Sequence, residues 1–490
     1  MTGKMKPKAR IGLYSIGLKA YWQQFPKLRN SLLSYGRFIE ERLAETCQVF
    51  NFGLVDDPAA GKAAGEWLNQ QQVDLVFVHS ATYCTSASVL PVHQICGAPA
   101  VILNLQPVAA MDYPHTGTGE WLACCGACPV PELVNALNRC GIRPAVINGL
   151  LGMEEALAGK EERPEALRAW REIGDYVDAA MVKRALLGAR IGFLGGNYAG
   201  MLDLYSDSTL LQKGFRVHIE PMEMCDLNAC LQRVTDKETE EKLDEIRRFF
   251  VISGGSPADP IAGEPDPLLL RKSAAAACAL DRLTDGFGLD ALAYYYHGAE
   301  GGTYEHLAAQ LIVGNSLLTA AGIPCAGEGD LKTAIAMKIC DLLGTGGSFT
   351  EIVAADYNRG TILLGHDGPF HMAIAAQKPF LRGMKLYHGK RGEGISVEAK
   401  VKPGPVTLLG ITQTATGGLR CIISEGEAVA GQTLMIGNTQ THVKFGLPID
   451  EYYSRWFAQS PTHHCAVSIG HNAARFQRVA ELLGLEWVRI

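Results

Sequence analysis

The sequence has no apolar run of about 18 residues or more, so no membrane-spanning helix is expected. It also lacks an excess of positive charge: 45 Lys and Arg residues face 51 Asp and Glu residues, and the formal net charge is −6 at pH 7. Proteins that bind nucleic acid usually carry a basic patch, so no nucleic-acid partner is expected. The basic segment 1–10 runs directly into a strand-like segment and lacks an apolar core region and a cleavage site. It is therefore not interpreted as a signal peptide.

The 14 cysteines are mostly scattered singly inside apolar segments, as at Cys278 and Cys340. This pattern is typical of a reduced, cytoplasmic protein in which thiols pack as small hydrophobic groups. One cluster departs from it, formed by Cys124, Cys125 and Cys128. The last two have metal-type spacing, but no second Cys or His pair follows at the distance of a zinc site. We expect a glycine-containing turn before a helix there, with a zinc or redox site as the alternative.

A chain of 490 residues is too long for one hydrophobic core, so two or three domains are expected. In the first part of the chain, apolar segments alternate with helical stretches, one of which has Pro131 in its first turn and Gly141 just past its end. This alternation predicts parallel βαβ units. The expected strands are residues 11–16, 49–54, 73–78, 100–105 and 144–147.

A charged helical stretch at 161–187 separates this part from a second one of the same kind. The second part has expected strands at 189–194, 215–219 and 289–295, and a charged helix at 237–248 that we expect to present a solvated face. After about residue 375 the segments become short, β-branched and separated by glycines, which predicts antiparallel strands. These strands are expected at 406–411, 419–424 and 433–436, before a final helix at 473–483 and a final strand at 486–490.

The predicted fold class is α/β, with two Rossmann-like parallel-sheet domains followed by a smaller, mostly antiparallel β-domain. The predicted domain boundaries are 1–177, 178–373 and 374–490. Glycines in the second domain suggest a nicotinamide-binding site as one hypothesis. Their spacing is not G-x-G-x-x-G, however, and a sharp turn after a strand explains them equally well. These glycines are Gly192, Gly195, Gly196 and Gly200.

The segment 326–372 carries the most informative polar residues. Glu328 lies between two glycines just before a helix that Asp330 is expected to cap. A carboxylate at this position is favoured by the helix dipole. Four apolar residues are expected to form one face of that helix: Leu331, Ile335, Ile339 and Leu342.

A second acid, Glu351, is expected at the end of the next glycine-rich loop, and His366 follows a short strand at 361–364. His371 comes shortly after. Two acids and a histidine, each beside glycine at the end of an element, indicate a metal site more readily than simple packing. The alternative for each residue taken singly is a helix cap or a turn.

The adjacent residues His463 and His464 offer a further ligand. Side chains of neighbouring residues in an extended segment point in opposite directions, so only one of the two is expected to face the site. A set of carboxylates and imidazoles without thiolate suits Mn²⁺, Mg²⁺ or Co²⁺ with positions left for substrate oxygens. Such a site suits proton transfer next to a carbonyl, where one carboxylate acts as a base and another as an acid.

These residues resemble the L-fucose isomerase and L-arabinose isomerase superfamily. Glu328 stands in Glu-Gly-Asp-Leu-Lys-Thr-Ala, and Glu351, which is 23 residues later, closes Gly-Gly-Ser-Phe-Thr-Glu. His366 follows Leu-Leu-Gly, and His464 is the second residue of the histidine pair. The resemblance implies that these four residues are the metal ligands, with the two glutamates also the acid–base pair. The residue pair at His366 departs from the arabinose isomerases, which leaves His371 as an alternative ligand.

Weaker parts of the same resemblance lie in 18–25, 81–83 and 200–203. They imply substrate contacts for a further set of residues: Trp22, Gln24, Thr82, Tyr83, Met201, His371 and His463. In relatives the N-terminal domain of a neighbouring subunit contributes to the substrate pocket, so the resemblance implies a homo-oligomer, trimer or hexamer, with a shared active site.

The combined expectation is an Mn²⁺-dependent enzyme that interconverts an aldose and a ketose through an enediol. Its sugar substrate could be a pentose, a deoxyhexose or a modified sugar. One alternative is a non-catalytic sugar-binding or regulatory protein that clamps its ligand between two α/β lobes. Another is a nicotinamide-dependent oxidoreductase.

Overall fold

The structure, a computed structural model, describes residues 6–385 and 392–490. Residues 1–5, which belong to the segment not interpreted as a signal peptide, lie outside the described residues. The chain divides into two compact units, residues 6–184 and a second unit that comprises the described residues from 185 onward. Residues 178–373 and 374–490, predicted as separate domains, thus lie almost entirely in one compact unit. Among the described residues, no helix is both long and apolar enough to cross a bilayer.

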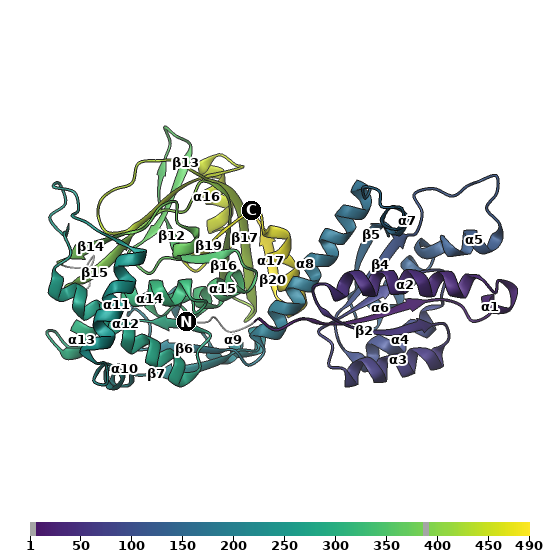
Figure 1. Ribbon diagram of the computed structural model, residues 1–490, viewed down its shortest axis with the longest axis horizontal. Coiled ribbons are helices and arrows are strands. Elements are labelled where there is room, and N and C mark those ends of the chain that lie inside the picture. Colours follow the sequence, from purple (N-terminus) through teal and green to yellow (C-terminus); the bar gives the residue numbers. More distant parts are fainter. Residues whose placement is uncertain (1–5, 386–391) are drawn as a thin grey trace. The chain divides into compact units, whose positions relative to one another are not determined.

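The first unit is a parallel α/β layer structure (Figure 1). Its five-stranded sheet has the order β2-β1-β3-β4-β5, and every paired strand runs parallel to its neighbour. The strands are β1 (Arg10–Ile16), β2 (Gln48–Val55), β3 (Leu75–His79), β4 (Ala100–Gln106) and β5 (Ala145–Leu150). The longer helices are α2 (Leu28–Ala44), α3 (Pro58–Gln70), α4 (Ser86–Cys96), α6 (Val130–Arg139) and α8 (Pro164–Leu186). The short elements are α1 (Tyr21–Gln24), α5 (Thr118–Ala123), η1 (Cys125–Ala127) and α7 (Met153–Leu157).

The second unit begins with a four-stranded parallel sheet of order β11-β10-β6-β7. Its strands are β6 (Arg190–Leu194), β7 (His218–Met222), β10 (Ala291–Tyr294) and β11 (Cys325–Ala326). Its helices are α9 (Ser208–Phe215), α10 (Met224–Leu231), α11 (Asp236–Phe249), α12 (Pro267–Phe287), α13 (Thr303–Ala308), α14 (Leu311–Ala320) and α15 (Leu331–Leu342). Together with the first unit, this sheet confirms the prediction of two parallel α/β regions.

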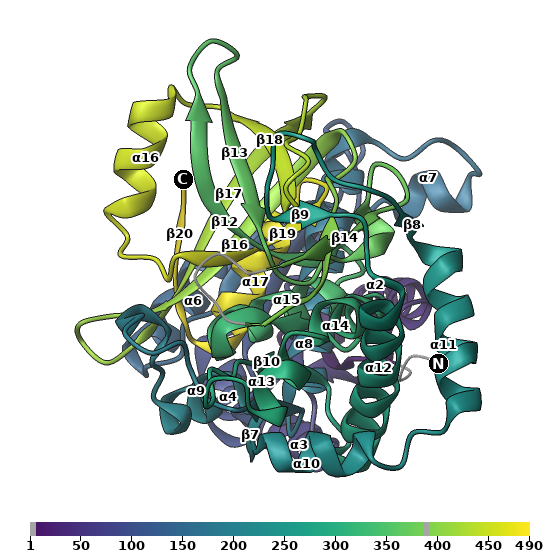
Figure 2. The ribbon, with the colours of Figure 1, turned by 90° about the vertical axis from the view of Figure 1, so that its left-hand side faces the viewer.

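A closed antiparallel barrel follows the parallel sheet in the second unit (Figure 2). Pairings run β16-β19-β12-β13-β18-β17, β16 pairs again with β17, and β20 extends the sheet in parallel beside β17. The strands are β12 (Gly346–Asp356), β13 (Thr361–His366), β16 (Gly404–Gln413), β17 (Leu419–Val429), β18 (Thr439–Phe445), β19 (His464–Ile469) and β20 (Glu486–Arg489). Two helices, α16 (Ile449–Phe457) and α17 (Ala473–Leu483), flank it. This barrel confirms the predicted antiparallel β-region, which begins at residue 346 rather than after residue 375.

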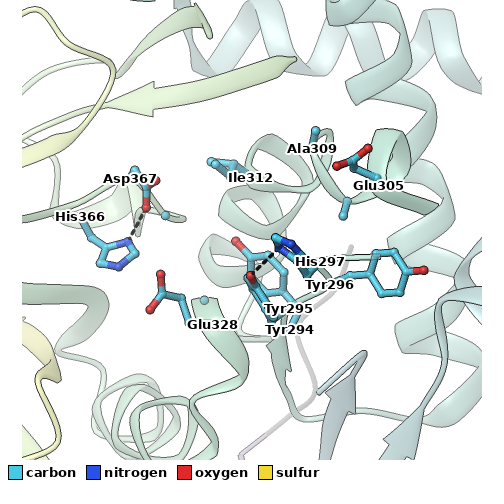
Figure 3. A pocket seen from close by; sticks show the side chains of 13 residues that line it. Tyr294, Tyr295, Tyr296, His297, Glu305, Ala309, Ile312, Glu328, His366 and Asp367 are labelled. Atoms are coloured by element: carbon cyan, nitrogen blue, oxygen red, sulfur yellow. Dashed lines mark hydrogen bonds and ion pairs between the residues drawn. The ribbon is translucent and has the colours of Figure 1, made fainter. Parts of the chain in front are cut away.

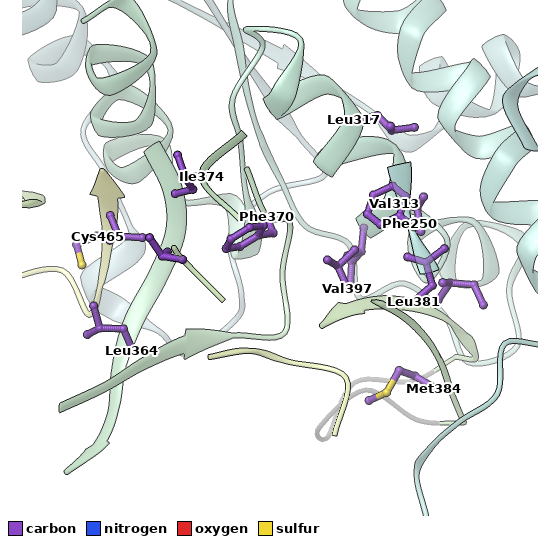
Figure 4. Close-up of a cluster of buried hydrophobic side chains, with 14 of the residues drawn as sticks. Phe250, Val313, Leu317, Leu364, Phe370, Ile374, Leu381, Met384, Val397 and Cys465 are labelled. Carbon is purple, nitrogen blue, oxygen red and sulfur yellow. The ribbon is translucent and has the colours of Figure 1, made fainter. Parts of the chain in front are cut away.

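A smaller sheet and the barrel share one core with the neighbouring helices (Figure 4). The small sheet consists of β8 (Val251–Ile252), β9 (Ala262–Gly263), β14 (Phe380–Met384) and β15 (Gly394–Glu398). Val313 of α14, Leu381 of β14 and Leu364 of β13 all belong to this core. Hydrophobic contact therefore joins the helical layer to the β-region within this unit.

α15 is buried almost all round, which corrects the expectation of a single apolar face. It contacts β6, β10 and β11 of the parallel sheet and also β12, β16 and β19 of the barrel. Asp341 is its one residue that is not fully buried. A helix between two layers must pack on every side, so its small and apolar residues are spread around it.

One further local prediction is wrong and another is confirmed. Residues 433–436 form a loop and not a strand, because the side-chain amide of Gln440 bonds to both the N–H and the carbonyl of Leu434 in place of a neighbouring strand. The charged helix predicted at 237–248 is α11, and it presents a solvated charged face as predicted, while Leu243 and Ile246 on its other side are buried in the core.

Candidate metal centre

Glu328 lies in a tight connection, the turn η3 (Gly327–Gly329), between the parallel sheet and α15. Its φ angle is +59°, a left-handed conformation that is uncommon for residues with a side chain. Gly329 follows at φ +74°, and a Cβ atom there would lie 2.1 Å from the carbonyl oxygen of Gly196. The N–H of Tyr198 donates to the carbonyl of Glu328 at 3.1 Å. Two of the glycines in the predicted turn, Gly195 and Gly196, thus belong to a loop that packs against the connection carrying Glu328.

Asp330 caps α15 as predicted and also contacts a candidate ligand. One of its oxygens accepts from the backbone N–H groups of Lys332 and Thr333, at 3.0 and 3.1 Å. The other lies 3.2 Å from Nδ1 of His464. Burial by itself raises the pKa of Asp330, but hydrogen bonding to His464 and the charge of Lys332 outweigh it and lower the pKa. Asp330 is therefore an ionised partner that orients the imidazole of His464.

Two histidine rings meet in the interior beside Glu328. His464 begins β19 and His366 ends β13, and their Nε2 atoms lie 3.2 Å apart. Nε2 of His464 is also 3.5 Å from a carboxylate oxygen of Glu328. Nδ1 of His366 lies 3.1 Å from Asp367. The hydrogen bond between Nδ1 of His464 and the carboxylate of Asp330 favours a proton on Nδ1 and leaves Nε2 of His464 as an acceptor, whereas Nδ1 of His366 is close to Asp367 without a hydrogen bond to it.

A carboxylate oxygen and two imidazole nitrogens that face one another in the interior form a donor set that can hold a cation. Metal–nitrogen bonds of about 2.1 Å place neighbouring ligand atoms about 3 to 3.5 Å apart, close to the separations observed here. The ligand atoms of Glu328, His366 and His464 all lie within 4.8 Å of one another. His464 has the hydrogen-bonded carboxylate partner, Asp330, that is typical of metal-binding imidazoles. The donor set of these residues therefore fits a divalent metal ion.

Glu351 approaches the same centre from β12, opposite His464 in the antiparallel pairing of β12 with β19. Its ligand atom lies within 4.8 Å of those of His463 and His464. The prediction that it ends a glycine-rich loop is wrong, because β12 already begins at Gly346 and carries Glu351 in its interior. Burial raises the pKa of Glu351, although the charges of His366 and His463 act in the opposite direction.

His463 also faces the centre, so the expectation that only one of the pair does so is wrong. β19 begins at His464, and the alternation of side chains along a strand does not extend back to His463. Nδ1 of His463 lies 2.6 Å from Asp203, and Nε2 lies 3.8 Å from Glu328. Burial by itself lowers the pKa of His463, but Glu328 and Asp203 raise it to about 9. His463 is therefore a cation beside the carboxylate of Glu328.

His371, the alternative to His366, is buried outside this group of residues. It precedes η4 (Met372–Ile374), and its backbone N–H donates to the Ser348 hydroxyl at 3.2 Å. Burial lowers the pKa of its side chain. Within the described parts of the chain, neither potential metal-binding group includes His371, whereas one of them includes His366.

Met201, one of the predicted substrate contacts, lies in the same unit as the centre, just before η2 (Leu202–Leu204), and is half-buried. Trp22 and Gln24 lie in the first unit on α1. The indole N–H of Trp22 donates to Asp56 at 2.7 Å, whereas Gln24 is exposed. The substrate contacts of these residues stay predictions.

Thr82 and Tyr83 also lie in the first unit, in the connection after β3. The Thr82 hydroxyl is buried and donates to the carbonyl of Leu122 at 2.7 Å. The Tyr83 hydroxyl donates to Glu132 at 3.1 Å. Both hydroxyls thus have protein partners, and the role of these residues in substrate binding stays a prediction.

A pocket of about 80 Å³ opens beside the centre, with room for several water molecules (Figure 3). Glu328, His366 and Asp367 line one part of it. The sequence analysis did not predict a role for the residues that line the rest of the pocket. These are Tyr294, Tyr295, Tyr296, His297, Glu305, Ala308, Ala309 and Ile312. An aromatic run at the carboxyl end of a parallel strand could have indicated them, since ligands bind at that edge of α/β sheets.

Comparison with known proteins indicates which proteins this chain is related to. The chain is similar to an L-arabinose isomerase. It is 25% identical to the L-arabinose isomerase of Nocardioides sp. over 347 residues, which is 69% of this chain and 66% of that protein. The match thus spans slightly less than two thirds of the relative's length, and no family model matches the chain. This similarity supports a relationship to sugar isomerases, while the predicted link to L-fucose isomerases stays a prediction.

Proposed function

We propose that this protein is a metal-dependent aldose–ketose isomerase. The observation that carries the proposal is the convergence of Glu328, His366 and His464 on one point, with Glu351 paired opposite His464. The similarity to an L-arabinose isomerase supports the same chemistry.

The proposed metal ligands are Glu328, Glu351, His366 and His464. Their oxygen and nitrogen donors, without thiolate, suit Mn²⁺ and also Mg²⁺ or Co²⁺. When bound, such an ion would supply Lewis-acid chemistry that polarises the sugar carbonyl.

The two glutamates supply the proton transfers. Glu328, which lies beside the cationic His463, removes the proton from the carbon next to the carbonyl. Glu351 acts in the second proton transfer: it donates a proton to the carbonyl oxygen, and the sugar becomes an enediol. Return of the first proton to the former carbonyl carbon, with loss of the proton from the neighbouring hydroxyl to Glu351, completes the isomerisation.

The proposed substrate is a pentose, a deoxyhexose or a modified sugar. We also propose a homo-oligomer, a trimer or hexamer, in which Trp22, Gln24, Thr82 and Tyr83 of a neighbouring subunit border the pocket. Light scattering of the purified protein tests the oligomeric state, and a monomer with full activity would contradict the shared pocket.

Metal analysis combined with an aldose screen tests the function. Purified protein treated with a chelator should lose isomerase activity, and added Mn²⁺ should restore it. Glu328→Gln should lower kcat by roughly 10²- to 10⁴-fold, the usual contribution of a general base, while circular dichroism stays unchanged. Sugar binding without metal and without turnover would identify a sugar-binding protein instead, and full activity of Glu328→Gln would refute the assigned base.

A further inference from the structure

Glu305 lies on α13 and lines the same pocket as Glu328 and His366 (Figure 3). It has no part in the proposed proton transfers or in metal binding. Only 5% of its surface is exposed, although glutamate is rarely buried to this extent. This burial requires an explanation.

Capping of α13 explains only one of the two carboxylate oxygens. Oε2 of Glu305 accepts from the backbone N–H of Gly301 at 2.6 Å, just ahead of the helix. Oε1 is buried, and no group in the described parts of the chain bonds to it. Buried carboxylate oxygens nearly always have hydrogen-bond donors, because their desolvation is otherwise costly. A donor from a bound ligand would supply what Oε1 lacks.

The rest of the pocket indicates what kind of donor fits. Ala308, Ala309 and Ile312 form apolar walls beside Glu305, and among the residues 6–385 and 392–490 no Lys or Arg lines the pocket. His297 also lines the pocket, and its Nδ1 lies 3.4 Å from the hydroxyl of Tyr295. A neutral hydroxyl group carried on a carbon chain can contact these apolar walls and donate to Glu305.

We propose that Glu305 accepts a hydrogen bond from the hydroxyl at the end of the sugar that is remote from the reacting carbons. The inference rests on the proposed function, since the reacting carbons lie at Glu328 and the rest of the carbon chain extends along the pocket. Among the proposed substrate classes, it selects sugars with a terminal hydroxyl over their terminally deoxygenated counterparts. A site with a buried acceptor rejects an analogue without the donor, because the acceptor is then left unpaired.

Calorimetric titration of the Mn²⁺-loaded protein with unreactive sugar alcohols tests this specificity. The probes are L-arabitol against 5-deoxy-L-arabitol, and galactitol against L-fucitol, which differ only in the terminal hydroxyl. The unmodified protein should bind the hydroxylated member roughly 10- to 100-fold more tightly in at least one pair. Glu305→Gln keeps the side-chain shape and an acceptor for Gly301, and should lower this ratio about tenfold. Glu300→Gln, which removes an exposed carboxylate five residues away, should leave it unchanged.

A purely structural role for Glu305 would weaken both members of a pair equally and leave their ratio intact. An unchanged ratio in Glu305→Gln, equal binding of both members by the unmodified protein, or binding of neither pair overturns the inference. A different result would show that the isomerase proposal fails. In that case the protein converts no aldose, but it still prefers the hydroxylated alcohol, and this preference still depends on Glu305.

Discussion

At the scale of the residue, Glu328 combines an unfavourable backbone with the carboxylate that the centre needs. In the left-handed region its Cβ crowds the backbone carbonyl, at a cost of about 1–2 kcal/mol. Glycine would take this conformation without the penalty but would provide no ligand. Residues held in such conformations concentrate at functional sites. Here the N–H of Tyr198 donates to the carbonyl of Glu328, and the next residue, Gly329, lies close against the carbonyl of Gly196, so the connection is held in place.

Because of this backbone conformation, we expect a glycine variant at position 328 to be more stable than an alanine variant, the reverse of the usual order of stability. Glu328→Gly should be more stable than Glu328→Ala by about 1 kcal/mol, because both remove the carboxylate and only alanine retains the strained Cβ. Urea unfolding of the metal-free variants measures the difference. At an ordinary helical position alanine is the more stable of the two, so greater stability of Glu328→Ala would contradict the assigned backbone conformation.

At the scale of the element, the start of α15 and the adjoining barrel strands assemble the centre. Asp330 at the N-cap contacts His464 of β19, and β19 pairs with β12 at Glu351. β13 lies on the other side of β12 and ends at His366. One helix terminus and three neighbouring strands thus place four side chains without any long flexible loop, which favours fixed ligand geometry.

Asp330→Asn should weaken Mn²⁺ binding roughly 10- to 100-fold, the usual effect of losing the carboxylate behind a metal-binding histidine. Asparagine still caps a helix well, so the stability of α15 should change little. Asp266→Asn is the matched control, since Asp266 caps α12 in the same manner and contacts no proposed ligand. Calorimetric titration with Mn²⁺ gives both affinities. Equal affinities of the two variants would show that Asp330 acts only as a cap.

At the scale of the whole molecule, the first unit is expected to lose stability in acid. The first unit buries His79 and His93 beside hydroxyl groups, at 2.9 Å from Ser15 and 2.9 Å from Tyr14 respectively. Burial lowers the pKa of His79 to about 3 and that of His93 to about 4. The folded unit therefore holds both imidazoles neutral, whereas the unfolded chain protonates them near pH 6.5.

The sign of the resulting pH dependence follows from linkage. Above about pH 6.5 both states are neutral and the first unit has its full stability. As the pH falls toward 4, the unfolded state binds protons that the folded state does not, and stability decreases. Hydrogen exchange of β1, β3 and α4, corrected for intrinsic rates, should show this loss, and His79→Gln should reduce its slope. His115→Gln, at an exposed site of the same unit, should not. A pH-independent protection would contradict the buried neutral state.

Much of the fold could be predicted because its signals are local. The apolar segments near β1, β4 and β16 alternate with helical or glycine-rich stretches, and hydrophobic periodicity reports on such elements directly. The prediction failed where a tertiary partner replaced a local one. At Leu434 a glutamine side chain takes the place of a neighbouring strand, and α15 loses its single apolar face because layers pack on both sides of it.

The sequence by itself determined the chemical types available at the centre, the cap at Asp330 and the glycines around Glu328, since these depend on residues close together in the chain. Only the tertiary structure decided that His463 faces Glu328, that His366 rather than His371 lies with His464, and that Glu305 borders the same pocket. The physical reason is the closure of the barrel. Strand pairing brings residues about a hundred positions apart within a few ångströms of one another, and no local pattern encodes which strands will pair.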